Sequence, residues 1–126
     1  MTTPDPGFES VDELAKRGYQ IARIDAAAPA TEREFLGAIG AALDFPDYYG
    51  HNLDALNDCM RDVVNQVYGW RPGTAGLVIV FTGYQTAAAR WPRTAQLTLD
   101  IMARAARDAD LAGRRLLCRT DDPARD

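Results

Sequence analysis

Residues 77–81 read LVIVF, an uninterrupted run of five apolar side chains rich in β-branched and aromatic members. A short run of this kind, bounded by loop residues, is typical of a central strand that is covered on both faces of a sheet. Gly69, Pro72, Gly73 and Gly76 precede it and indicate a loop. We therefore expect a buried strand here, with a layer of structure on each side.

Two further strands are predicted on either side of this run along the chain. Residues 19–24 (YQIARI) alternate with a period of two, and residues 115–119 read RLLCR. Helical patterns separate all three strands. Strands joined by helical crossovers run parallel with right-handed connections. The sequence therefore predicts a small α/β domain with a three-stranded parallel sheet.

Capping signals mark where several helices begin. Ser10 to Glu13 and Thr31 to Glu34 are capping boxes, which predict a short helix ending near Gly18 and an amphipathic helix over 32–43. Asn52 can cap a third helix, whose apolar stripe would be Leu53, Leu56, Met60, Val63, Val64 and Val67.

A last helix is expected from about 95 to 111. Pro92 and Thr94 precede it and Gly113 ends it. Its inner face would be formed by Leu97, Ile101, Met102 and Ala105.

The length of 126 residues fits one domain, which we place at 10–119, between flexible tails at 1–9 and 120–126. No run approaches the length of a membrane span, and the N-terminus lacks the apolar stretch of a secretory signal. Two cysteines make no disulfide scaffold. We expect a cytoplasmic protein that is monomeric when free and has no membrane contact.

Charge is distributed unevenly. Residues 44–62 hold five Asp against one Arg, and residues 90–119 hold seven Arg against three Asp. A negative segment repels nucleic acid and attracts basic partners. The arginines lack interleaved aromatic residues, so we expect a solvated face and no direct binding of nucleic acid.

Signals for catalysis are weak. The chain has one His, no cysteine pair with zinc spacing, no phosphate-binding glycine loop and no nucleophile elbow. Asp54 and Asp58 leave open a small hydrolase or metal carboxylate site. We nevertheless expect no enzyme, no metal and no cofactor.

Residues 45–60, FPDYYGHNLDALNDCM, are the most informative stretch for function. With the apolar stripe inward, Asp54, Asp58 and Asp62 form a row on the outer face of the helix. Such a row can be merely a solvated face, and like charges at this spacing cost a few tenths of a kcal/mol each. Tyr48 and Tyr49 just before the helix favour a recognition surface, because tyrosine offers apolar area and a hydroxyl together.

This segment resembles the signature of the barstar family, intracellular inhibitors of secreted microbial ribonucleases. The matching residues are Leu43, Pro46, Tyr48, Tyr49, Gly50, Asn52, Leu53, Asp54, Ala55, Leu56, Asp58 and Cys59. The resemblance, extended as a layout over about 19–119, implies a barstar-like three-stranded parallel sheet. It also implies a one-to-one complex in which the motif blocks the active site of a guanyl-specific ribonuclease, with Asp58 in place of a substrate phosphate. Carried over by match, the partner-binding residues would be Tyr48, Gly50, Asn52, Asp54 and Asp58. We also expect Tyr49, Asn57 and Asp62 on this surface.

Some positions depart from the family pattern. Asn57 stands where many members have Trp, and Val63 stands where a well-known member has a second Trp. Asp62 stands near a Gly of that member, and Arg104 stands where its last helix carries a Glu. These departures suggest a different ribonuclease. The alternative is an immunity or interaction module for another basic toxin or protein.

Four other side chains are of a kind that can carry a function. We expect His51 to be an exposed loop residue, Cys59 to be a buried or half-buried free thiol, and Trp70 and Trp91 to pack at the edges of the core.

Overall fold

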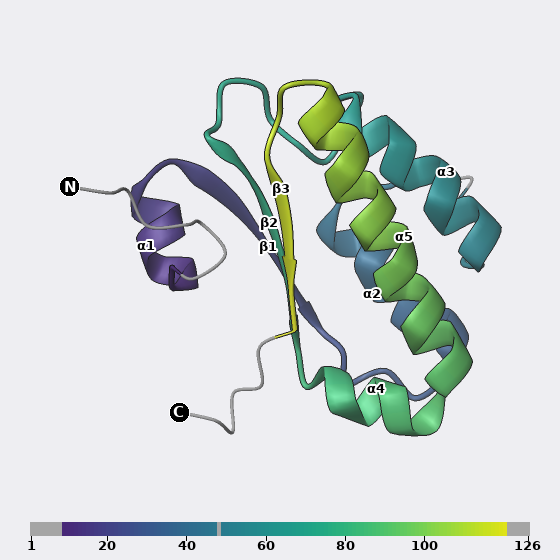
Figure 1. Ribbon diagram of the computed structural model, residues 1–126. Helices are drawn as coiled ribbons and strands as arrows, with labels where there is room; N and C mark the ends of the chain where they lie inside the picture. Colours follow the sequence, from purple (N-terminus) through teal and green to yellow (C-terminus); the bar gives the residue numbers. More distant parts are fainter. Residues whose placement is uncertain (1–8, 48, 121–126) are drawn as a thin grey trace.

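The three strands form one parallel sheet in the order β1-β2-β3. The computed structural model describes residues 9–47 and 49–120, and its strands are β1 (Tyr19–Asp25), β2 (Gly76–Thr82) and β3 (Leu116–Arg119) (Figure 1). Ile21 pairs with Val78, which pairs with Leu117 on its other side. All of β2 except Thr82 is buried. The predicted parallel sheet with 77–81 at its centre is therefore confirmed.

Helices cover the two faces of this sheet unequally. In the described part of the chain they are α1 (Val11–Lys16), α2 (Glu32–Ala42), α3 (Leu53–Val64), α4 (Tyr84–Arg90) and α5 (Pro92–Leu111). α1 lies alone on one face, whereas α2, α3 and α5 lie on the other, and α4 follows directly from the end of β2 (Figure 1). None of the helices in the described residues is both long and apolar enough to cross a bilayer.

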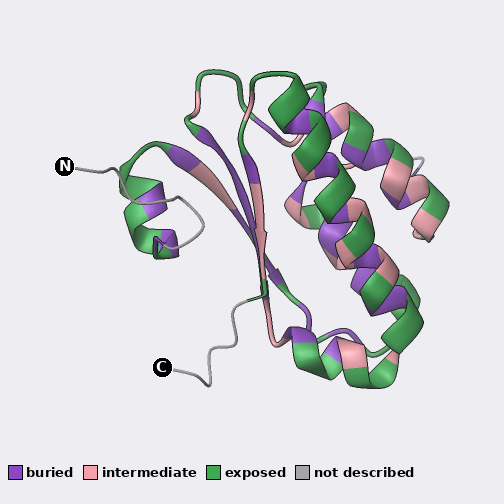
Figure 2. Ribbon diagram, in the orientation of Figure 1, coloured by how far each residue is buried: buried purple, intermediate pink, exposed green. Residues whose placement is uncertain are grey.

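The alternation of side chains along β2 divides the core into two clusters. Leu77, Ile79 and Phe81 belong to the larger cluster, together with buried residues of α2, α3 and α5. Val78 and Val80 belong to the smaller one, beneath α1. The buried residues of the helices accordingly face the sheet, and the exposed ones line the outside (Figure 2). The continuous apolar run of β2 is required because both of its faces are covered.

Side-chain caps start the first three helices where the sequence predicts. Ser10 Oγ accepts from the Glu13 amide, and Thr31 Oγ1 accepts from the Glu34 amide, each at 3.1 Å. Asn52 Oδ1 accepts from the amide three residues later at 2.8 Å. Each cap satisfies an amide that has no partner within its helix.

The helix α5 differs from the prediction in its start and in its inner face. It begins at Pro92, and its buried residues are Thr94, Ala95, Thr98, Met102, Ala105 and Ala109. Met102 and Ala105 are buried as predicted, whereas Leu97 and Ile101 are only half-buried. Most of the buried side chains are small, which lets the helix approach its neighbours closely.

Three other expectations need correction. α3 ends at Val64, and Val67 beyond it is 65% exposed because the chain turns at Gln66 with a φ of 61°. Glu9, expected in the tail, is buried and accepts a hydrogen bond from Arg17. The helix α4 was not anticipated. It begins after Gly83, whose φ is 66°, without any side-chain cap.

The two tryptophans pack as predicted. Trp70 is buried, and its indole nitrogen donates to Thr74 Oγ1 at 3.0 Å. Trp91 is half-buried against the core, with its ring 6.0 Å from that of Phe35.

Candidate protein-binding site

Tyr49 anchors the segment that joins α2 to α3. Its ring is 7% exposed and packs edge-on against Phe45, with 4.8 Å between ring centroids. Its hydroxyl donates to the carbonyl of Leu36 in α2 at 3.0 Å. Gly40 of α2 provides the space, because a Cβ there would lie 2.9 Å from the tyrosine ring. Burial raises the pKa of Tyr49 well above its ordinary value, so the hydroxyl stays a donor.

This burial corrects the expectation that Tyr49 belongs to the partner-binding surface. The residue is a packing residue, since its ring lies in the main core cluster and its hydroxyl already has a partner. The other tyrosine of the pair, Tyr48, lies outside the described residues.

Directly before α3, the left-handed backbone falls on His51 rather than on Gly50. His51 has a φ of 53°, in the left-handed region, whereas Gly50 is exposed and is not among the glycines of positive φ. The His51 ring lies 4.9 Å from that of Tyr49, between centroids, and is half-buried. The expectation of an exposed histidine is therefore corrected, because the ring is packed against the anchor of the loop.

Asn52 connects the loop to the helix. Its side-chain oxygen caps α3, and its amide nitrogen lies 3.5 Å from the carbonyl of Gly50. A Cβ on Gly50 would come within 3.0 Å of that nitrogen. Asn52 thus has a structural duty as a cap, although its side chain is exposed.

The helix α3 has two sharply different faces. Its inner face is formed by the buried residues Leu56, Cys59, Met60, Val63 and Val64. Asp54 and Asp58 are exposed on the outer face, and neither carboxylate has a hydrogen bond or ion pair with another described residue. Asp54 lies in the first turn, where the helix dipole favours a negative charge. The structure thus holds two unpaired carboxylates at a spacing of one turn on a capped helix.

Asp62 differs from these two aspartates. It is half-buried and accepts a hydrogen bond from the Tyr68 hydroxyl at 3.1 Å. Burial, with contributions from Cys59 and Asp62, raises the pKa of Tyr68 above its ordinary value, which keeps the phenol a donor. Asp62 is therefore already engaged within the chain.

The remaining motif positions face the core or the neighbouring helix α5. Asn57 is half-buried and lines a groove between α3 and α5, and Val63 is fully buried. Cys59 is a buried free thiol, as predicted. Val63 therefore cannot present side-chain area to a partner in the way that a surface tryptophan would.

The geometry offers little for the hydrolase alternative. Asp54 and Asp58 stand exposed, and no group of three His, Cys, Asp or Glu side chains in the described residues could hold a metal ion. The arrangement is suited to pairing with positive groups of a partner.

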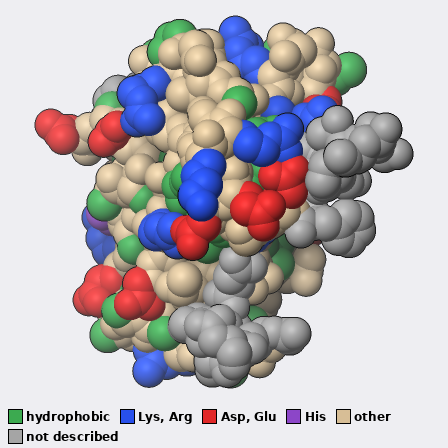
Figure 3. All heavy atoms as spheres, turned by 90° about the vertical axis from the view of Figure 1, so that its left-hand side faces the viewer, with side chains coloured by type: hydrophobic (Ala, Val, Ile, Leu, Met, Phe, Trp, Pro, Cys, Tyr) green, Lys and Arg blue, Asp and Glu red, His purple; other side chains and the backbone are tan. Residues whose placement is uncertain are grey.

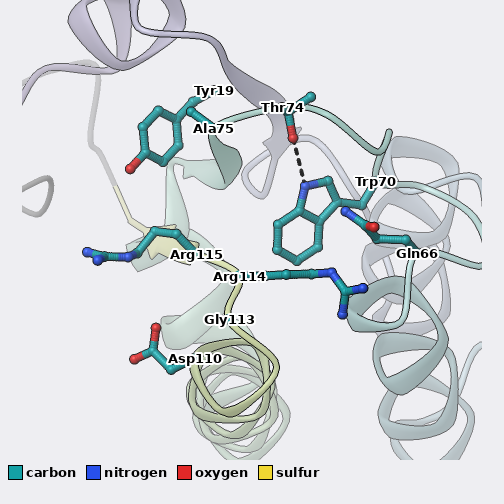
Figure 4. A pocket seen from close by; sticks show the side chains of 9 residues that line it. All are labelled: Tyr19, Gln66, Trp70, Thr74, Ala75, Asp110, Gly113, Arg114 and Arg115. Atoms are coloured by element: carbon teal, nitrogen blue, oxygen red, sulfur yellow. Dashed lines mark hydrogen bonds between the residues drawn. The ribbon is translucent and has the colours of Figure 1, made fainter.

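A separate hollow of about 440 Å³ lies at the amino ends of the strands. Trp70 forms its inner wall, Arg115 and Asp110 lie at its rim, and Arg114 reaches toward Gln66 (Figure 4). The Arg114 guanidinium donates to the carbonyl of Val64 at 3.3 Å, at the end of α3. None of the predicted partner-binding residues that the structure describes lines this hollow.

The face covered by α1 has a mixed charge. Acidic and basic side chains lie interspersed over the part of it that is described (Figure 3). α3, with its unpaired aspartates, lies on the opposite side of the sheet (Figure 1).

Comparison with known proteins agrees with this arrangement. A family model described as Barstar (barnase inhibitor) matches residues 19–121. A search of curated proteins found no match. The matched range includes all three strands and the whole α3 segment. The chain therefore belongs to the barstar family, whose members are inhibitors of barnase-type ribonucleases rather than enzymes.

Proposed function

We propose that this protein binds one molecule of a secreted, guanyl-specific microbial ribonuclease and blocks its active site. The outer face of α3 and the loop before it would enter the active site. Asp58 would take the position of a substrate phosphate, with Asp54 beside it. A preorganised carboxylate is a good mimic of phosphate among arginine, lysine and histidine side chains.

The observation that carries this proposal is the pair of exposed, unpaired carboxylates on a capped helix. Neither aspartate has to break an internal hydrogen bond or ion pair before it meets a cation. The buried Tyr49 fixes the loop in advance, which lowers the entropy lost on binding. We assign the direct contacts to Gly50, Asn52, Asp54, Asn57 and Asp58, with Tyr48 as a further candidate. Asp62 would lie at the margin because Tyr68 already engages it.

Such an inhibitor protects the cell that makes the ribonuclease. We propose that it acts in the cytoplasm as a monomer until it meets its target. The family consists of intracellular proteins, which supports this location.

A second candidate is an immunity module for another basic toxin. Two positions that depart from the family pattern argue for a target other than a barnase-type enzyme. Asn57 replaces the tryptophan that many members carry, and Arg104 places a positive charge on α5 beside α3. Both change the chemistry that the surface offers to a barnase-type enzyme.

Titration against a panel of guanyl-specific microbial ribonucleases tests the proposal. We expect RNA cleavage by at least one enzyme to fall to zero at a one-to-one ratio. The double variant Asp54→Ala, Asp58→Ala serves as the control, because it keeps the fold and loses the two unpaired carboxylates. Full cleavage by every enzyme at a large excess of the wild type would contradict the proposal. Binding to a basic toxin without ribonuclease activity would then favour the second candidate.

A further inference from the structure

A groove runs between α3 and α5 next to the unpaired aspartates. It consists of two hollows of about 400 and about 220 Å³. Asn57, Ile101 and Arg104 line both, so the two hollows adjoin each other. Asp54 lines the first hollow and also lies on the outer face of α3. The groove is therefore an extension of the proposed interface.

The floor of the groove is apolar. Leu53 of α3 and Leu97 and Ile101 of α5 line it, and all three are half-buried. Leu53 and Ile101 pack against the main core, whereas Leu97 is not part of that packing. Half-buried leucine and isoleucine side chains beside a hollow leave apolar area that a partner's side chain can cover.

Arginines stand along the α5 side of the groove. Arg104 and Arg107 are exposed, and neither has a hydrogen bond or ion pair with another described residue. Asp100, one turn before Arg104, accepts instead from Gln96 at 3.0 Å. Beside two unpaired carboxylates on α3, the first hollow thus presents two unpaired guanidinium groups on α5, and Asp108, one turn after Arg104, lines only the second hollow.

We propose that this groove determines which ribonuclease the protein binds, an inference that rests on the proposed function. It receives an apolar side chain of the ribonuclease that stands next to an acidic one. The apolar side chain packs on Leu53, Leu97 and Ile101, and the acidic group pairs with Arg104 and Arg107. A partner that is uniformly basic around its active site would meet repulsion from these arginines, because like charges in apposition disfavour binding.

The direction in which a charge reversal at Arg104 changes the affinity tests this proposal. Arg104→Glu makes the protein more negative by two charges. If only long-range attraction to a basic enzyme mattered, the variant would associate faster and bind at least as well. The groove proposal predicts the opposite, a faster dissociation and a loss of affinity of about tenfold or more. Lys16→Glu on α1 is the matched control, since it makes the same change in charge on the other side of the sheet.

Leu97→Ser tests the apolar floor. The side chain lies outside the core packing, so the variant should melt within a few degrees of the wild type. We expect it to weaken binding about tenfold through faster dissociation. Association and dissociation rates of all three variants would be measured against a panel ribonuclease that the wild type inhibits. In a second step, each Asp and Glu on that ribonuclease would be replaced by Lys, and one replacement should restore binding to Arg104→Glu.

The outcomes separate the two proposals. If Asp58→Ala loses binding while Leu97→Ser and Arg104→Glu bind like Lys16→Glu, the groove proposal is overturned and the proposed function stands. If no replacement of an Asp or Glu of the ribonuclease by Lys restores binding to Arg104→Glu, the proposed pairing with Arg104 is overturned. If the wild type inhibits none of the ribonucleases, the proposed function fails, and the assignment of the groove fails with it.

Discussion

Replacing Asp58 by Ala should make the protein more stable and a much weaker inhibitor. Asp58 has like-charged neighbours one turn before and one turn after it, Asp54 and Asp62, and Arg61 three residues after it. Each like-charge pair at this spacing costs about 0.2–0.5 kcal/mol, and the attraction to Arg61 offsets one of them. Alanine also has a higher helix propensity than aspartate, by up to about 0.7 kcal/mol. The free energy of unfolding should therefore rise by roughly 0.5–1 kcal/mol.

The affinity should change in the other direction and by more. If Asp58 occupies a phosphate site, its removal leaves positive groups of the enzyme buried without a partner. This typically costs about 2–5 kcal/mol or more. It corresponds to a loss of about 30-fold to several thousand-fold in Kd. Asp54→Ala should lose less, because Asp54 lies nearer the end of the helix.

Two measurements check this pair of effects. Urea unfolding gives the stability, and stopped-flow mixing with an inhibited ribonuclease at low and high salt gives the rates. Asp110→Ala is the control, since it removes an exposed aspartate at the far end of α5. The reasoning would be refuted by unchanged binding rates in Asp58→Ala. A stability loss greater than about 1 kcal/mol would equally refute the view of Asp58 as an unpaired surface charge.

The structure supports three further predictions. Gly69→Ala should lower the free energy of unfolding by more than about 2 kcal/mol in a urea titration. The reason is that Gly69 has a φ of 75° and that a Cβ there would lie 2.2 Å from the Leu43 carbonyl oxygen. An unchanged urea midpoint would contradict this prediction. Gly50→Val should harm inhibition more than stability, since the site is exposed and the only close neighbour of a new Cβ is the Asn52 amide at 3.0 Å, at the edge of the α3 cap. Unfolding of the variant would show instead that the loop is structural. Burial raises the pKa of the Cys118 thiol from 9.0 to about 12. Because the unfolded chain loses the thiol proton at a lower pH than the folded one, the free energy of unfolding should be unaffected by this group below pH 9 and should fall as the pH rises toward 12. The fall should be shallower in Cys118→Ala.

The sequence predicts the sheet well because the signal for it is local and unambiguous. The run 77–81 is apolar throughout, and only a strand covered on both faces requires such a run at that length. The caps at Ser10, Thr31 and Asn52 are equally local, since each bond spans three residues. The helix α4 has neither signal. It is seven residues long, starts without a side-chain cap, and depends on the Tyr84 hydroxyl, which reaches the carbonyl of Ala95 in α5.

The candidate site was predicted in part for the same reason. The exposure of Asp54 and Asp58 follows from helical periodicity once Leu56 and Met60 face inward. The burial of Tyr49 depends on a contact with Gly40, nine residues earlier in α2. Two adjacent tyrosines in a turn carry no local signal for which one is buried. The signal that could have indicated this packing is Gly40, because a glycine on the inner face of an amphipathic helix leaves space for an aromatic ring.

The error about the inner face of α5 has a consequence for function. Periodicity assigns the largest apolar side chains, Leu97 and Ile101, to the core. The structure buries Ala95, Thr98 and Ala109 instead, and small side chains bring a helix axis closer to what it packs on. The helix is rotated accordingly, so that Leu97 and Ile101 stand at the edge that faces α3, whereas Met102 stays in the core. The same packing that keeps α5 close to the sheet therefore creates the apolar floor of the groove. Because this floor adjoins Asp54, the residues that set the position of α5 also shape what the acidic face of α3 can bind.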